Sequence, residues 1–484
     1  METLDWLVIG IFFLALIGII VWVVKQKQND SADYFLGGRD ATWLAIGASI
    51  FASNIGSEHL IGLAGAGASS GMAMAHWEIQ GWMILILGWV FVPFYSRSMV
   101  FTMPEFLERR YNPQSRTILS VISLISYVLT KVAVTVYAGG LVFQQVFGIK
   151  ELWGIDFFWI AAIGLVILTA LYTIFGGMKS VLYTSILQTP ILLLGSLIIL
   201  VLGFKELGGW DEMMRICGAV TVNDYGNTMT ELIRSNNDPN FPWLGALIGS
   251  AIIGFWYWCT DQFIVQRVLS GKNEKEARRG TIFGAYLKLL PVFLFLIPGM
   301  IAFALHQKYL GTGGEGFLPM LANGNANADA AFPTLVAKLL PAGVKGLVVC
   351  GILAALMSSL ASLFNSSAML FTIDFYKRFK PNTSEKKLVG IGQMATVAIV
   401  ILGILWIPIM RSVGDVLYTY LQDVQSVLAP GIAAAFLLGI CWKRTSAQGG
   451  MWGLIAGMII GLTRLGAKVY YSNAGEVADS TFKY

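Results

Sequence analysis

Apolar runs of about twenty residues recur along the whole chain, and this recurrence constrains the fold more than any other feature. Only 13% of the 484 residues are charged, whereas a soluble protein carries about 25%. The sequence therefore predicts an all-α polytopic membrane protein with about twelve spans, the ninth long enough to continue past the membrane. The predicted spans lie near 5–24, 41–69, 75–96, 117–145, 153–175, 180–203, 243–267, 281–304, 334–376, 388–410, 415–441 and 447–468.

The distribution of lysine and arginine among the connecting loops predicts how the chain is oriented. With the N-terminus outside, most of the basic residues fall in loops that face the cytoplasm, near 97–116, 267–279, 377–387 and 443–444. Cytoplasmic loops of membrane proteins carry this excess. We therefore expect a multi-pass protein of the cell (plasma or inner) membrane with an extracytoplasmic N-terminus. Topology accounts for the net charge of +5, so no nucleic-acid partner is expected.

Two of the predicted spans, five spans apart, contain helix-breaking residues. The second span carries Ser53-Asn-Ile-Gly-Ser57, and the seventh carries Gly249, Ser250 and Gly254 ahead of Asp261. Irregular backbone survives in a bilayer only where it lines a cavity or is buried in protein. Interrupted helices at matching places in two halves indicate an inverted-repeat transporter with its site near the bilayer midplane. The alternative is that these glycines only allow helices to pack closely.

Polar side chains near these breaks are the candidate solute ligands. His59 follows the first break, Glu78 begins the third span, Lys288 lies in the eighth and Gln422 in the eleventh. Ionisable groups at membrane depth are functional candidates and can exchange hydrogen bonds with the hydroxyls of a polyol. The simpler alternatives are a wet helix end for Glu78, snorkelling for Lys288, packing for His59 and interhelical bonding for Gln422.

Two aromatic residues and a pair of serines complete the candidate sites. Tyr257 and Trp258 are placed to stack on a sugar face, although aromatics in a span also form interfacial belts. In the ninth span, the Ala355 carbonyl and the adjacent hydroxyls of Ser358 and Ser359 suit a hard cation such as Na⁺. The break near Ala52 and Ile55 would supply the remaining oxygens. The alternative is that these serines bond only their own helix.

The sequence carries no HExxH, P-loop, GxSxG or dinucleotide-binding motif in its proper context, so we do not expect an enzyme. Several stretches instead resemble the sodium/solute symporter family, specifically its sodium/glucose cotransporter branch. The resemblance extends over nearly the whole chain. It is carried by Asp33-Tyr-Phe-Leu-Gly-Gly-Arg39, Ser53-Asn-Ile-Gly-Ser57, Gly176-Gly-Met178, Trp256-Tyr-Trp-Cys-Thr-Asp-Gln262, Gln266-Arg267, Gly284-Ala-Tyr-Leu-Lys288, Leu356-Met-Ser-Ser-Leu-Ala-Ser-Leu-Phe-Asn365 and Phe436-Leu-Leu-Gly-Ile-Cys-Trp-Lys-Arg444.

This resemblance implies a LeuT-like core of two inverted five-helix repeats within one transporter domain, 1–484. The repeats would occupy 41–203 and 243–441, with extra helices at 5–24 and 447–468. Longer members carry further spans, which the core should not need. The implied sodium site comprises the carbonyls of Ala52, Ile55 and Ala355 with the hydroxyls of Ser358 and Ser359. The implied sugar site comprises His59, Glu78, Tyr257, Trp258, Lys288 and Gln422, with Tyr257 as the inner-gate aromatic.

Three departures from the family pattern refine the expectation. Ser185 stands where many members carry an aspartate linked to a second sodium ion, and Ala361 stands where some carry a hydroxyl. We therefore expect one sodium ion per solute. Gly254 also lacks a side chain that contacts sugar in some relatives.

The leading hypothesis is a sodium-coupled symporter that imports glucose or galactose by alternating access, with sodium, a sugar and the lipid bilayer as its partners. The alternatives are a sodium-coupled symporter of myo-inositol, sialic acid or another organic solute, and a sugar-responsive sensor or channel-like protein.

Overall fold

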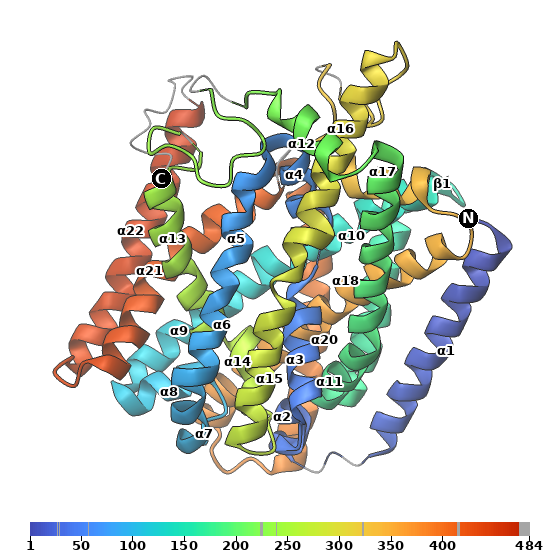
Figure 1. The fold of residues 1–484 in the computed structure, drawn as a ribbon. Helices are drawn as coiled ribbons and strands as arrows, with labels where there is room; N and C mark the ends of the chain where they lie inside the picture. Colours follow the sequence, from blue (N-terminus) through green and yellow to red (C-terminus); the bar gives the residue numbers. More distant parts are fainter. Residues whose placement is uncertain are drawn as a thin grey trace.

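The computed structural model describes residues 1–26, 28, 30–56, 58–222, 226–238, 240–321, 324–413 and 417–473, without the side chains of 129–130, 409–413, 417–423 and 468–473. Helices make up nearly all of it (Figure 1). Two short strands, β1 (Glu151–Leu152) and β2 (Ile155–Asp156), pair as an antiparallel hairpin. The hairpin occupies residues that we predicted as the start of the fifth span, so that helix begins later, at Phe157.

The helices of the first half are α1 (Thr3–Lys25), α2 (Ser31–Leu36), α3 (Trp43–Asn54), α4 (Ala64–Ser70), α5 (His76–Ile79), α6 (Met83–Ile86), α7 (Val92–Ser98), α8 (Met103–Arg110), α9 (Pro113–Ser126), α10 (Ala133–Phe147), α11 (Phe157–Leu207) and α12 (Trp210–Gly218). Those of the second half are α13 (Trp243–Gly254), α14 (Gln262–Leu269), α15 (Glu274–Leu287), α16 (Ile297–Gly311), α17 (Ala331–Leu339), α18 (Val344–Met369), α19 (Lys377–Phe379), α20 (Glu385–Val413), α21 (Leu417–Cys441) and α22 (Ala447–Asn473). Wider π-helical turns join several of them, at Glu58–Leu63, Leu87–Phe91, Tyr127–Val132, Phe255–Thr260, Val292–Leu296 and Leu370–Tyr376.

In the described chain, nine helical segments are long and apolar enough to cross a membrane. Two of these segments hold two of the predicted spans each. Glu58–Ser98 contains the end of the second span and the third, with a left-handed glycine, Gly71, between them. Phe157–Leu207 contains the fifth and sixth. The fourth span is the run from α9 to α10. With these two double segments and this run, the described helices account for the predicted number of crossings.

α11 reverses its direction at Gly177. A straight helix of 51 residues would be about 76 Å long. Instead, the strand hairpin that precedes α11 and the helix α12 that follows it lie at the same end of the molecule (Figure 1). Gly177 has φ 52° and ψ −150°, and a Cβ there would lie 2.4 Å from the Tyr34 carbonyl oxygen. Only glycine adopts this backbone conformation readily, so the residue ends one span and begins the next.

The ninth predicted span is not one continuous helix over 334–376. α17 ends at Leu339 and α18 begins at Val344, with extended backbone at Leu340 and a left-handed Gly343 between them. Pro341 explains the interruption, because a proline disfavours helical backbone in the residue before it. The helix that follows is the most enclosed of the candidate spans, with 89% of its apolar window buried. α18 therefore forms the centre of the bundle.

The loops sort to two ends of the molecule as the basic residues predict. The loops that follow α7, α14, α19 and α21 lie at the lower end in Figure 1. The N-terminus, the strand hairpin, α12 and the turn before α17 lie at the upper end. The loops that we predicted to be cytoplasmic therefore share one end, opposite the N-terminus.

Candidate functional site

The first predicted break is present in the structure. α3 ends at Asn54, and Ile55 has extended backbone, with φ −77° and ψ 104°. The chain becomes helical again at Glu58, as a π-helical turn that leads into α4. Ser57 lies outside the described residues. A Cβ on Gly56 would lie 2.9 Å from the Ser359 hydroxyl, so this glycine lets the broken helix approach α18 closely.

The second break lies further along the chain than we predicted. Gly254 is helical, with φ −60° and ψ −41°, and α13 continues through the π-helical turn Phe255–Thr260. The backbone becomes extended only at Asp261, with φ −73° and ψ 129°. A Cβ on Gly254 would lie 2.9 Å from Oε1 of Gln80. The glycine therefore serves close packing, and the prediction of an interruption at Gly249–Gly254 is wrong.

The predicted sodium ligands lie on facing helices, α3 and α18. The Ser359 hydroxyl donates to the Ser53 carbonyl at 2.7 Å and to the Ile55 carbonyl at 3.5 Å. Ala52 and Ala355 are buried on the same two helices. This set of neutral oxygens fits Na⁺, which is a hard cation that prefers oxygen ligands. Across the described residues, no group of three or more His, Cys, Asp or Glu side chains could hold a metal.

Ser358 has a different partner from Ser359. Its hydroxyl lies 3.3 Å from that of Ser185 on α11. The nearby Ser362 hydroxyl donates to the Ser53 hydroxyl at 2.9 Å and to the Ser358 carbonyl at 2.7 Å. The serines of α18 thus bond across helices as well as within their own. The alternative that they bond only within their helix does not hold.

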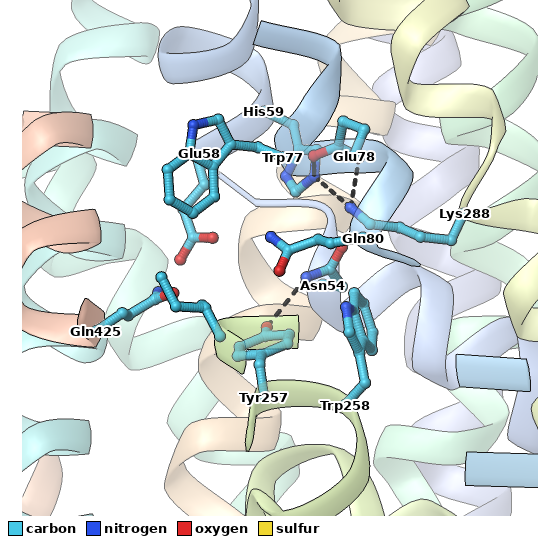
Figure 2. Close-up of a pocket in the computed structure, with 11 residues that line it drawn as sticks. Asn54, Glu58, His59, Trp77, Glu78, Gln80, Tyr257, Trp258, Lys288 and Gln425 are labelled. Atoms are coloured by element: carbon cyan, nitrogen blue, oxygen red, sulfur yellow. Dashed lines mark hydrogen bonds and ion pairs between the residues drawn. The ribbon is translucent and has the colours of Figure 1, made fainter. Parts of the chain in front are cut away.

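A small polar cavity lies beside the first break. The side chains that line it come from five separate parts of the chain and converge on one place (Figure 2). They are Asn54, Glu58, His59, Trp77, Glu78, Gln80, Ile253, Tyr257, Trp258, Lys288 and Gln425.

Three of the predicted solute ligands form one ionic cluster in this cavity. The Lys288 ammonium lies 2.6 Å from Oε2 of Glu78 and 2.8 Å from Nε2 of His59. Nε2 of His59 lies 3.2 Å from the other carboxylate oxygen of Glu78. All three side chains are buried, so Glu78 is not a wet helix end and Lys288 does not snorkel to the surface. Pairing offsets the large cost of taking each charge out of water.

Tyr257 and Trp258 form the aromatic wall of the cavity. Their rings meet edge to face, with centroids 4.8 Å apart. The Asn54 amide donates to the Tyr257 hydroxyl at 3.0 Å, which joins the two interrupted helices directly. The Lys288 ammonium lies 5.6 Å from the Trp258 ring centre. These aromatics therefore line the cavity and do not form an interfacial belt.

Several residues of the cavity were missed from the sequence. The Gln422 side chain lies outside the described residues, whereas Gln425, three positions along the same helix, lines the cavity. Asn54, Glu58, Trp77 and Gln80 were also missed as ligands. Oδ1 of Asn54, Nδ1 of His59 and Oε1 of Gln80 are buried without a hydrogen-bond partner among the described residues. Buried polar atoms are usually paired, so this geometry favours a polar ligand.

Comparisons with known proteins agree with this geometry. The sequence model described as "SSF: Sodium:solute symporter family" matches residues 34–457. Human sodium/myo-inositol cotransporter 2 is 39% identical over 479 residues, which cover 96% of this chain and 70% of that protein. Mouse sodium/glucose cotransporter 4 is 38% identical over 486 residues, with 98% and 70% coverage.

Two solved structures share the fold. A Na⁺-coupled sialic acid symporter in a substrate-bound outward-open state has a TM-score of 0.78 at 22% identity, covering 96% of this chain and 98% of that one. MhsT in complex with L-phenylalanine has a TM-score of 0.55 at 14% identity, with 90% and 99% coverage. The fold is therefore LeuT-like, as expected, and sodium is the coupled ion. Because the family model covers most of its length, the chain belongs to the sodium:solute symporter family.

Proposed function

We propose that the protein imports a neutral ring polyol together with Na⁺, one ion per solute, by alternating access. Glucose, galactose and myo-inositol are the candidate solutes. The observation that carries this proposal is the cavity, in which the ionic cluster of His59, Glu78 and Lys288 faces buried amide oxygens that find no hydrogen-bond partner in the described part of the chain. Such groups offer both donors and acceptors, which is what a ring with several hydroxyls needs.

The charge in the cavity favours a neutral solute over an acidic one. Glu78 and Lys288 neutralise each other at 2.6 Å. Glu58 directs a second carboxylate into the cavity from the opposite wall (Figure 2). An anion such as sialate would meet this carboxylate, and like charges at close range repel strongly where water is scarce. The two relatives described above carry names of myo-inositol and glucose cotransporters, which supports the same solute class.

The contact between the two halves suggests how Na⁺ would be coupled to the solute. The proposed ion ligands on Ile55 and Ser359 join the broken helix to α18, and Asn54 joins it to Tyr257 in the cavity wall. Binding of Na⁺ at the break would therefore fix the backbone that positions the solute ligands. The membrane potential supplies about 2.3 kcal/mol per charge per 100 mV. One ion and its concentration gradient are enough to sustain a solute gradient.

A transport assay tests this proposal. The purified protein, in proteoliposomes, would be given labelled glucose, galactose, myo-inositol and sialic acid, each with external Na⁺ or with choline. We expect Na⁺-dependent uptake of at least one neutral polyol and none of sialic acid. Equal uptake in choline would refute the coupling, and uptake of sialic acid alone would refute the solute class. A polyol-gated current without uptake would instead indicate a sensor or channel.

Tyr257→Phe gives a finer test of the cavity. It removes the hydroxyl that accepts from Asn54 and leaves the ring in place. The matched control is Tyr309→Phe. The Tyr309 hydroxyl bonds Glu206 at 3.1 Å, and neither residue lines the cavity. We expect the first variant to weaken polyol uptake and the second to leave it unchanged. The same uptake in both variants would place Tyr257 outside the site.

A further inference from the structure

A buried ion pair lies directly beyond the cavity, outside the set of predicted ligands. The Lys131 ammonium lies 2.6 Å from Oδ2 of Asp261, and both residues are 4% exposed. Lys131 belongs to the π-helical turn Tyr127–Val132, in the fourth span. Asp261 is the extended residue of the second break and follows the π-helical turn that carries Tyr257 and Trp258. The pair therefore joins an interrupted helix of one repeat to an uninterrupted span of the other.

Further hydrogen bonds hold Asp261 in place. Its Oδ1 accepts from the Tyr127 hydroxyl and from the Phe263 amide, the latter at 3.2 Å, which caps the start of α14. The same Phe263 amide lies 3.0 Å from the Tyr127 hydroxyl oxygen. The Asp261 amide donates to the Trp256 carbonyl at 3.0 Å. The carboxylate is thus fixed at the point where the helix is broken.

Lys131 is surrounded by aromatic rings. Its ammonium lies 5.0 Å from the ring centre of Tyr127, 5.6 Å from Trp256, 4.7 Å from Tyr257 and 4.9 Å from Phe263. Ring faces attract a cation, most strongly where water is excluded. Tyr257 belongs to both groups, because its ring lies beside Lys131 while its hydroxyl accepts from Asn54 in the cavity. A movement of Lys131 would therefore reach the cavity wall.

The pair lies on the route from the cavity to the predicted cytoplasmic end. Tyr257 forms the lower wall of the cavity in Figure 2, and the chain continues from it to Asp261 and then into α14. Every residue of α14, Gln262–Leu269, is buried. The loop after α14 lies at the end opposite the N-terminus (Figure 1). A fully buried helix therefore separates the cavity from this end, and the ion pair lies next to the cavity wall.

We propose that the Lys131–Asp261 pair is an inner latch, which holds the cavity closed toward the cytoplasm and separates each time Na⁺ and solute are released inward. The proposal rests on alternating access, but not on the identity of the solute. While the latch is closed, the two charges compensate each other in a dry environment. When the path opens, water hydrates both, which offsets the energy of separating them. Lys131 is thus a positioning residue that need not touch the solute.

The test uses a double variant, because removing one partner alone leaves an unpaired buried charge that can prevent folding. Lys131→Met with Asp261→Asn removes both charges and keeps similar volumes. The matched control is Arg234→Met with Asp238→Asn, another buried pair, whose partners lie 3.5 Å apart in the loop after α12. Lys131→Arg, which keeps the charge, is the conservative variant. Size-exclusion chromatography and thermal unfolding would first establish that each variant folds.

The measurement is the flux of radioactive Na⁺ into proteoliposomes without any solute. Loss of the latch should let the ion alone pass inward. We expect the double variant to raise this leak about tenfold, equivalent to about 1.4 kcal/mol of lost preference for the closed inner side. The control pair should leave the leak unchanged, and Lys131→Arg should restore low leak. A folded double variant with the wild-type leak would overturn the proposal, as would an equal rise in the control pair.

Failure of the solute assignment gives a different pattern. If the wild-type protein moves none of the tested polyols, the proposed solute class is wrong, yet the Na⁺ leak of the variants still reports on the latch. If polyol uptake is normal in the wild type and the leak of the double variant is unchanged, only the latch is wrong.

Discussion

At the scale of single residues, the cavity depends on buried charges that stabilise one another. Glu78, His59 and Lys288 come from three separate crossings, and the charge of Glu78 or Lys288 would be unstable alone in an apolar interior. Their mutual distances of 2.6–3.2 Å make them one electrostatic unit. A substitution of one of these residues therefore changes the electrostatic environment of the other two.

Glu78→Gln should destabilise the protein more than removal of the whole ion pair. It leaves the Lys288 ammonium buried beside a neutral amide, at a cost of about 3–5 kcal/mol. Glu78→Gln with Lys288→Met should recover much of this loss, because no unpaired charge remains. Thermal unfolding of the purified variants in detergent measures the difference. A double variant as unstable as Glu78→Gln would contradict the charge argument.

Ser359→Ala should weaken Na⁺ dependence without preventing folding. It removes the hydroxyl that lies 2.7 Å from the Ser53 carbonyl and within 3.5 Å of the Ile55 carbonyl. Loss of one ligand worth about 1 kcal/mol should raise the half-saturating Na⁺ concentration about fivefold. The control is Thr169→Val, whose buried hydroxyl bonds the Leu165 carbonyl of its own helix at 2.7 Å. An unchanged Na⁺ titration of uptake in Ser359→Ala would exclude this serine as a ligand.

At the scale of helices, the site exists because regular structure stops at specific residues. The first break brings backbone carbonyls to α18, and the second places Asp261 beside Lys131. Elsewhere the glycines have other roles. Gly254 allows close packing on Gln80, and Gly177 turns the chain back through the membrane.

Gly177→Ala should destabilise the protein, and Gly164→Ala in the same helix should not. A Cβ at Gly177 would meet the Tyr34 carbonyl at 2.4 Å in backbone that costs about 1–3 kcal/mol for other residues. A Cβ at Gly164 would meet no atom within 4 Å, and alanine there should gain about 0.5–1 kcal/mol of helix stability. The two variants can be compared by expression level, chromatography and thermal unfolding. Equal stability of both would refute a turn-forming role for Gly177.

At the scale of the whole molecule, basic loops gather at one end and the N-terminus lies at the other (Figure 1). α18 and its neighbours enclose the break, the cavity and the proposed latch between these two ends. The end that faces the cytoplasm therefore determines the direction of transport. The proposed import of solute therefore requires that the basic end faces the cytoplasm.

Cysteine labelling can establish this orientation. The background is Cys441→Ser, which removes the exposed free thiol among the four cysteines. Lys380→Cys and Glu315→Cys then place single exposed thiols at the two ends. A membrane-impermeant reagent applied to intact cells should label position 315 only, and position 380 should react after permeabilisation. The reverse pattern would invert the topology that we propose.

Local features were predictable from the sequence because they depend on short segments. Hydrophobic length predicts the crossings, and the run Ser53-Asn-Ile-Gly-Ser57 predicts the first break. The second break was misplaced because glycine spacing does not distinguish a packing glycine from an interruption. The helix over 334–376 was predicted as continuous because the effect of Pro341 was overlooked.

The sequence by itself determined that this chain is a bundle of membrane helices, interrupted at one polar segment, with buried charges that must find partners. Only the tertiary structure decided which partners they find. Lys288 lies 210 positions after Glu78 in the chain yet 2.6 Å from it in space, and Lys131 pairs with Asp261 from another crossing. The physical reason is that desolvation makes pairing obligatory but does not select the pair. Helix packing selects it, through contacts between residues far apart in the chain.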